Sequence, residues 1–145
     1  MRNHLLCAAL AVMACGGDWL SGPGTPMELA HESLKGRWVH TSSVHTVIGS
    51  PSTKYRHEFS PDEGSIMEFD GAGGVQHFRY APDAGPGPLD YTIRGDTLTM
   101  FFDYAAEVST TRLVLTLDSG VLHDFDGDGD EELAIEVTTH QRARD

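Results

Sequence analysis

The sequence predicts an all-β fold, an antiparallel barrel or sandwich of about eight strands preceded by a short helix. After residue 36 the apolar residues recur with a period of two, the spacing that turns one face of a strand into a core. Gly, Pro and Asp interrupt this pattern at short intervals, as they do in turns between strands. No long helical pattern follows residue 36, so consecutive strands are expected to be antiparallel.

Length and composition fit one globular domain. The chain has 145 residues, of which 39% are hydrophobic and 22% charged, and a chain of this length buries a substantial core. Its 22 acidic residues against 10 Lys and Arg give a formal net charge of -12. Because nucleic-acid binding needs clustered basic residues, this balance argues against a nucleic-acid partner. An excess of acidic residues instead favours the binding of cations or keeps the protein soluble.

Residues 1–14 have the pattern of a lipoprotein signal peptide. A short polar start leads into an apolar run over residues 5–14, which is too short to span a bilayer. The run closes on residues 12–16 (Val-Met-Ala-Cys-Gly), which resemble the bacterial lipobox. The resemblance implies cleavage before Cys15, diacylglyceryl modification of its sulfur and N-acylation. Acyl chains such as palmitate would then anchor the protein in the lipid bilayer.

An ordinary secretory signal cleaved near Ala14 is the alternative. Lipidation, however, also accounts for the two cysteines, because Cys7 leaves with the signal and Cys15 becomes the anchor. No thiol is then left for a disulfide. Gly16 stands where many inner-membrane lipoproteins of Gram-negative bacteria carry Asp, which by resemblance favours the outer membrane in such a host. We expect a lipid-anchored protein of the cell envelope.

The next segment is expected to be a tether that leads into a short helix. Residues 15–25 are rich in Gly, with no apolar period, as in a flexible linker. Residues 25–28 (Thr-Pro-Met-Glu) supply a capping residue, Pro at the first helical position and Glu three residues after the cap. This predicts a helix that begins there and ends by Gly36. The folded domain is expected over residues 26–145.

Eight strands are predicted along the rest of the chain. A Gly-rich turn occupies residues 70–74, and a Pro- and Gly-rich loop occupies residues 81–88. Gly95-Asp96 forms the strongest hairpin turn, since Gly at the first position suits type II′ geometry. The expected strands are 38–47, 55–59, 66–69, 75–80, 91–94, 97–102, 113–117 and 133–138.

Two motifs resemble those of bacterial lipocalin-like domains. Residues 34–38 (Leu-Lys-Gly-Arg-Trp) are similar to the family's Leu-x-Gly-x-Trp opening, and residues 91–98 to its Tyr-x-Ile-x-Gly-Asp-x-Leu hairpin. The resemblance covers roughly residues 29–140 and implies an up-and-down barrel of about eight strands. Such a barrel can hold one small apolar ligand. The resemblance also implies that Trp38 packs at the closed end, beneath a basic residue near the last strand, for which Arg142 is the candidate.

A ligand pocket would be lined by aromatic, branched and Met side chains on the predicted strands. The same side chains would equally fill a small barrel that holds no ligand. A slip of one residue in register would turn each set outward. The pocket candidates are Phe78, Tyr80, Tyr91, Ile93, Met100 and Phe102.

The most specific local feature is the acidic segment over residues 124–132 (Asp-Phe-Asp-Gly-Asp-Gly-Asp-Glu-Glu). Alternating carboxylates followed by Gly let a turning chain direct several oxygen ligands at one centre, as calcium requires. A helical EF-hand would need an acid at position 12, where this chain has Ile135, and the flanking residues are predicted strands. The segment resembles instead the shorter calcium loops of FG-GAP-type repeats.

That resemblance implies a set of calcium ligands and an inward-packing Phe125. The alternative is a solvated loop without an ion, but six acids in nine residues repel one another unless a cation neutralises them. No second copy of the repeat is present, so the loop is expected as a local feature of a different fold. The implied ligands are the side chains of Asp124, Asp126, Asp128 and Glu132 and the carbonyl of Asp130.

No catalytic motif stands out, and we expect a protein that is not an enzyme. Nucleophile-elbow, zinc-protease and phosphate-loop patterns are missing from the sequence. The histidines show no His-x-His spacing and are interpreted as surface residues, with zinc or copper binding left as an alternative without a defined geometry. His40 and His45 are five residues apart, so on a regular strand they would face opposite sides.

Two functions stay open. The first is a binding module whose barrel holds a small apolar ligand, with calcium stabilising a hairpin at its rim. The second is a structural or protein-interaction module of the envelope, with a filled barrel and no small-molecule ligand. A cavity of several hundred Å³ lined by aromatics would favour the first, and a filled interior the second.

Overall fold

The computed structural model describes residues 22–60, 62–78 and 89–144. The predicted signal peptide, Cys15, most of the tether and Tyr80 lie outside these residues. In chain order the elements are β1 (Pro26–Met27), α1 (His31–Leu34), β2 (Gly36–Val47), β3 (Lys54–Glu58), β4 (Ile66–Phe69), β5 (Gly74–Phe78), β6 (Leu89–Asp90), β7 (Thr92–Arg94), β8 (Thr97–Thr99), β9 (Asp103–Ser109), β10 (Arg112–His123) and β11 (Glu132–Arg142).

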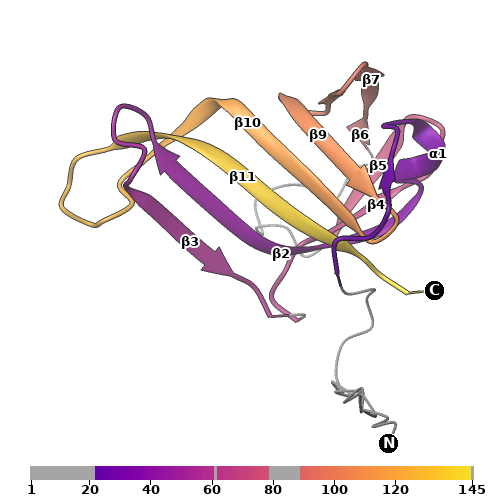
Figure 1. The fold of residues 1–145 in the computed structure, drawn as a ribbon, viewed down its shortest axis with the longest axis horizontal. Helices are drawn as coiled ribbons and strands as arrows, with labels where there is room; N and C mark the ends of the chain where they lie inside the picture. The colour runs from indigo at the N-terminus through magenta and orange to yellow at the C-terminus, as the bar shows by residue number, and fades with distance from the viewer. Residues whose placement is uncertain (1–21, 61, 79–88, 145) are drawn as a thin grey trace, which may run out of the picture.

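The strands form a nearly closed antiparallel barrel, as predicted (Figure 1). The order is β6-β5-β4-β2-β11-β10-β9-β8-β7, so chain neighbours are sheet neighbours and the β2–β11 pair joins the first long strand to the last. β3 and β4 follow one another along the same edge of β2. β6 pairs with β5 and β7 with β8, on either side of Tyr91. The described strands therefore form a barrel of nine successive antiparallel strands, against about eight predicted.

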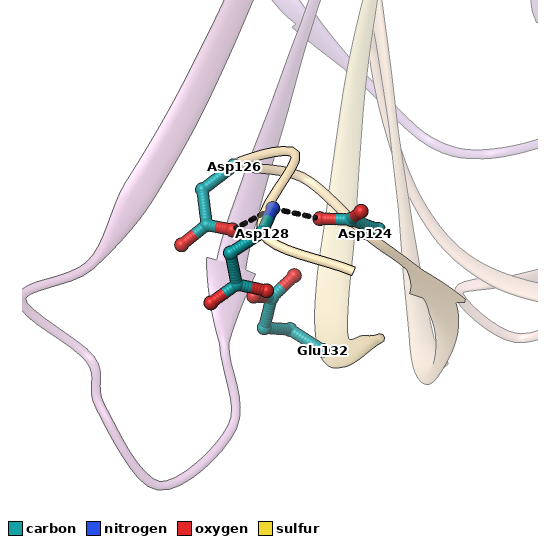
Figure 2. Close-up of side chains that lie close together, drawn as sticks. All are labelled: Asp124, Asp126, Asp128 and Glu132. Atoms are coloured by element: carbon teal, nitrogen blue, oxygen red, sulfur yellow. Dashed lines mark hydrogen bonds between the residues drawn. The ribbon is translucent and has the colours of Figure 1, made fainter. Parts of the chain in front are cut away.

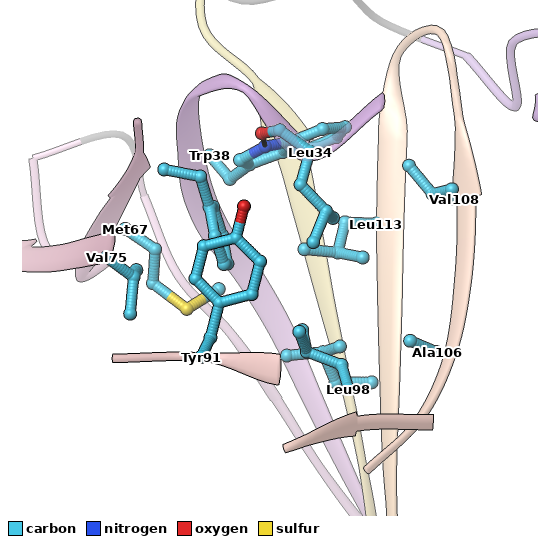
Figure 3. Close-up of a cluster of buried hydrophobic side chains, with 11 residues drawn as sticks. Leu34, Trp38, Met67, Val75, Tyr91, Leu98, Ala106, Val108 and Leu113 are labelled. Atoms are coloured by element: carbon cyan, nitrogen blue, oxygen red, sulfur yellow. Dashed lines mark hydrogen bonds between the residues drawn. The ribbon is translucent and has the colours of Figure 1, made fainter. Parts of the chain in front are cut away.

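The core lies beneath α1, at the end of the barrel near the C-terminus (Figures 1 and 3). Trp38 and Leu34 are fully buried there, and the Trp38 indole N–H donates to the Leu34 carbonyl at 2.6 Å. The Arg142 guanidinium lies 4.2 Å from the centre of the Trp38 ring. It also donates to the carbonyls of Ser33 and Lys35, at 2.6 and 2.7 Å. The predicted roles of Trp38 as core and Arg142 as its cover are confirmed.

Replacing Arg142 with Met should lower the free energy of unfolding by about 2–4 kcal/mol. The substitution leaves two carbonyls at the end of α1 without their charged donor and removes the cation–π contact on Trp38. Urea denaturation monitored by Trp fluorescence measures the change. The exposed Arg144 offers a matched control, and Arg144→Met should leave stability within about 0.5 kcal/mol of the original. Equal losses for the two variants would contradict this role for Arg142.

The helix is shorter than predicted, and its expected first turn is a strand. Pro26 and Met27 form β1, which pairs with Ser109 and Val108 of β9. Thr25 adds two hydrogen bonds to Thr110, each 3.0 Å long. Pairing with a sheet edge satisfies the same backbone groups that the capping box would have satisfied, so the tertiary contacts prevail over the local signal. The end of the predicted tether is thus bound to the barrel.

The short helix α1 begins instead after Ala30. The Ser33 hydroxyl accepts from the Ala30 N–H at 2.9 Å and donates to the Ala30 carbonyl at 2.8 Å. Gly36, the predicted stop, has a φ of +112°, a backbone conformation that favours glycine. Within the described residues, no helix has the length and apolar character needed to cross a membrane.

Candidate functional site

The acidic segment forms the loop between β10 and β11, at the end of the barrel opposite the C-terminus (Figure 1). Figure 2 shows four of its side chains gathered around one turn of chain. Carboxylate oxygens of Asp124, Asp126, Asp128 and Glu132 all lie within 4.8 Å of one another. The cluster could hold a metal ion. The side-chain ligands predicted from the sequence are therefore brought together.

The loop is shaped by backbone hydrogen bonds to Asp124. Its carboxylate accepts from the N–H groups of Gly127, Asp128 and Gly129, at 2.7, 3.2 and 3.0 Å. Gly127 and Gly129 have φ angles of +78° and +98°, which residues with a Cβ rarely adopt. The Asp126 carboxylate accepts a second bond from the Asp128 N–H, at 3.1 Å. These hydrogen bonds help to hold the carboxylates in place.

The four carboxylates repel one another electrostatically. The hydrogen bond from the Asp128 N–H lowers the pKa of Asp126, but desolvation and the charges of Asp128, Glu132 and Asp124 together raise it above its ordinary value. Desolvation also raises the pKa of the nearby Tyr55 phenol, and the same carboxylates add to the rise. A bound cation would relieve this repulsion. Carboxylate oxygens are donors that suit a hard cation.

Phe125 attaches the loop to the inner faces of the strands beneath it. Its ring centre lies 4.6 Å from that of His45, 5.1 Å from that of His123 and 5.3 Å from that of Tyr55, on which it stacks. Its N–H donates to a Glu132 carboxylate oxygen at 2.9 Å. Phe125 therefore packs inward, as expected, and connects the acidic cluster to the barrel.

Asp130 lies at the outer side of the loop. Its side chain is exposed and does not join the cluster of four carboxylates. Its N–H donates to the Asp128 carboxylate at 2.9 Å. The ligand role predicted for Asp130 uses its backbone carbonyl and not its side chain. That role stays a prediction.

A second feature is a cavity of about 150 Å³ inside the barrel. Polar and apolar side chains share its wall. The polar ones include Glu136, whose carboxylate accepts a hydrogen bond from, or pairs with, His45 Nε2 at 2.8 Å. The cavity is lined by His40, Ser65, Met67, His77, Met100, Phe101, Tyr104, Leu115, Glu136, Thr138 and His140.

The prediction that the histidines lie at the surface is wrong for the three that line this cavity. His140 is only 5% exposed, and His40 and His77 are half-buried. The rings of His40 and His140 stack with their centres 4.8 Å apart. Burial lowers the pKa values of His40 and His77, and it lowers the pKa of His140 to about 3. These imidazoles are neutral at neutral pH.

A β-bulge explains why His40 and His45 share the interior face, against expectation. His40 pairs with His140, whereas Ser42 pairs with Thr139, so Thr41 is an extra residue on β2. An extra residue reverses the alternation of every side chain beyond it. His45 therefore faces inward, where it meets Glu136.

The predicted pocket residues are scattered, and among those with described side chains Met100 alone lines the cavity. Tyr91 is buried in the core, 5.1 Å from Phe69 between ring centres, and Ile93 packs partly buried against that core. Phe102 is 57% exposed, because β8 ends at Thr99 and a turn breaks the alternation. Phe78 is the last residue of β5, and Tyr80 lies outside the described residues.

The interior polar residues of β11 were missed by sequence reasoning. Leu133, Ile135 and Val137 alternate along this strand, which suggested an apolar inner face. In the structure Glu136, Thr138 and His140 line the cavity instead. The signal was present in the sequence, because these three polar residues have the same period of two. Which set faces inward depends on the register.

Comparison with known proteins gives no match to this chain among family models, curated proteins or solved structures. The geometry of the loop and the cavity therefore carries the functional argument.

Proposed function

We propose that this protein is a lipid-anchored, non-enzymatic barrel of the cell envelope, similar to lipocalin-like domains, that binds calcium in its β10–β11 loop. The observation that carries the proposal is the convergence of four carboxylates from Asp124, Asp126, Asp128 and Glu132. The barrel interior is proposed to take a small ligand. Loop residue Phe125 extends toward that interior, so a calcium-ordered loop would stabilise one end of the barrel.

Calcium is favoured over other metal ions by the chemistry of the cluster. Its donors are all oxygens, which suits hard cations, whereas copper and zinc favour nitrogen and sulfur. Calcium takes six to eight oxygen ligands in flexible geometry, and magnesium needs a near-ideal octahedron. The cluster is half exposed, so water can complete the coordination of an ion with carboxylates and the Asp130 carbonyl.

Calcium should raise the melting temperature of the purified protein. A ligand present at about 100 times its Kd, and bound by the folded state alone, stabilises by about 2.7 kcal/mol. For a chain of this size that is a rise on the order of 6–15 °C. Differential scanning fluorimetry in millimolar calcium and in chelator measures the shift.

The variant Asp126→Asn/Asp128→Asn should abolish the shift, since it removes two charged ligands and keeps the side-chain shape. A matched control is Asp62→Asn/Asp118→Asn, which removes the same charge from exposed positions outside the cluster. The control should shift like the original protein. A calcium shift that persists in the loop variant would place the ion elsewhere.

The anchor is proposed to be Cys15, with the outer membrane as its location in a Gram-negative host. Cells grown with labelled palmitate should label the protein and retain it in the membrane fraction. Cys15→Ser should release an unlabelled form. Wild-type protein that stays unlabelled in the soluble fraction would rule out the anchor.

A protein-interaction role is the second candidate, favoured by an outward row of apolar side chains. Leu122 and Leu133 are register partners on β10 and β11, and the Ile48 N–H donates to the Leu133 carbonyl at 2.8 Å. The three side chains are 59%, 43% and 49% exposed. An interior cavity of about 150 Å³ is also smaller than most ligand pockets. Native mass spectrometry of protein extracted from its host separates the two roles, because a bound small molecule supports the first.

A further inference from the structure

Strand β3 lies at an open edge of the sheet in the part of the chain that the structure describes (Figure 1). It pairs with β2 over residues 54–58, and no other strand within residues 22–60, 62–78 and 89–144 pairs with it. Four of its five residues are exposed. The strand contains neither Pro nor Gly, and its pairing with β2 shows no register shift. A regular edge of this kind offers backbone hydrogen-bonding groups to another strand.

The register of β3 shows which backbone groups point to the open edge. The Val47 N–H donates to the Thr53 carbonyl at 3.1 Å, and the Phe59 N–H donates to the Thr41 carbonyl at 2.9 Å. Hydrogen-bonded pairs alternate with non-bonded pairs in an antiparallel ladder, so the odd-numbered residues of β3 bond to β2. The backbone groups that point away from β2 are those of the even-numbered residues, Lys54, Arg56 and Glu58.

The side chains of β3 are complementary to a second copy of the same strand. When two copies pair antiparallel about Arg56, Lys54 of each copy lies opposite Glu58 of the other, and opposite charges stabilise such cross-strand pairs. Tyr55 of each copy lies opposite His57 of the other, in a non-bonded pair where side chains approach most closely. The two Arg56 side chains meet at the centre, and each pairs with Glu58 of its own chain.

The backbone groups of β3 fit the same arrangement. Pairing about Arg56 places residue 54 opposite 58, 56 opposite 56 and 58 opposite 54, and these are the residues whose N–H and C=O groups point away from β2. Each of the three pairs exchanges two hydrogen bonds. A register shifted by one residue would instead bring in groups that already bond to β2, and it would lose the charge pairs.

We propose that this protein forms a twofold-symmetric dimer by antiparallel pairing of β3 with β3 of a second copy, centred on Arg56. The same surface of both copies makes the contact, so the assembly closes at two chains. The pairing continues the sheet of β10, β11, β2 and β3 from one barrel into the other. It uses a surface other than the row of Leu122, Leu133 and Ile48. It depends on neither the proposed calcium site nor the proposed ligand.

Sedimentation velocity over a range of protein concentrations tests the dimer. The Cys15→Ser chain in reductant is used, so that neither an acyl anchor nor a disulfide contributes. We expect an equilibrium between monomer and dimer. Arg56→Pro should abolish the dimer, because it removes the central N–H donors, and the fold should survive because that N–H points away from β2. The matched control Arg56→Thr removes the same side chain but keeps the N–H, and it should retain the dimer.

Charge exchange tests the register of the contact. Lys54→Glu places like charges opposite each other at both ends of the paired strands and should weaken dimerisation about tenfold or more. Adding Glu58→Lys restores opposite charges and should recover the affinity to within about threefold of the original. Lys35→Glu makes the same change of charge at an exposed position outside β3, and it should leave the affinity within about twofold.

Amide hydrogen exchange of the chain with unchanged β3 gives a readout that does not depend on a variant of the contact. Raising the protein concentration should slow exchange at Lys54, Arg56 and Glu58, whereas Tyr55 and His57 already bond to β2 and should change little. A chain that stays monomeric at every concentration, a dimer that persists in Arg56→Pro, or a loss in Lys54→Glu that Glu58→Lys does not reverse would each overturn the proposal.

Discussion

Lowering the pH from 7 to 4 is expected to reduce the free energy of unfolding by about 3 kcal/mol through His140 alone. Its folded-state pKa is about 3, against an ordinary value of 6.5. Between these values the unfolded chain binds a proton that the folded chain does not, so stability falls as the pH falls. The contribution is complete above pH 6.5 and lost progressively toward pH 3. Urea denaturation at a series of pH values measures it.

Variants separate His140 from the other groups that titrate in this range. His140→Phe should flatten the pH dependence by the amount given above, even where its stability at neutral pH differs. His57→Gln is the control, because His57 is exposed and lies outside the cavity. An undiminished slope in His140→Phe would mean that the buried imidazole is not the group responsible.

Replacing Trp38 with Ala is expected to cost about 3–5 kcal/mol of the free energy of unfolding. Trp38 is fully buried between α1 and the sheet, and its removal opens a large void in the core. It also leaves the Arg142 guanidinium without the ring that it covers. Chemical denaturation followed by circular dichroism measures the loss.

Two further variants test the physical reason for that loss. Trp38→Phe keeps an aromatic ring for Arg142 and should cost clearly less than Trp38→Ala. Combined with Arg142→Met, Trp38→Ala should cost less than the sum of the two single losses, because the residues are in contact. Additive losses would show that the ring and the guanidinium act independently.

The barrel itself could be predicted because most of its strands show a local alternation of apolar residues in the sequence. β4 has the predicted bounds, β2 begins two residues earlier than predicted, and β3 and β5 differ by one or two residues at each end. β9 was largely missed, since Asp103, Ala105 and Glu107 on its outer side are poor strand formers. Its inner residues Ala106 and Val108 supply the burial that fixes it as a strand. Tertiary packing here prevails over propensity.

The two candidate sites differ in how much the sequence could predict. The acidic cluster lies within nine consecutive residues, so spacing alone brings its ligands together. The cavity collects side chains from strands far apart in the chain, and the bulge at Thr41 sets which residues of β2 face it. Nothing in the spacing of His40 and His140 indicates that their rings stack. Such a site depends on register, which local patterns do not determine.

Isothermal titration of the chelator-treated protein with calcium chloride tests directly whether the β10–β11 loop binds calcium. We expect one calcium ion bound per chain. Asp126→Asn/Asp128→Asn should lose the binding heat, and Asp62→Asn/Asp118→Asn should retain it. A protein that gives no calcium heat, or a loop variant that binds as well as the original, would show that this loop is not a calcium site.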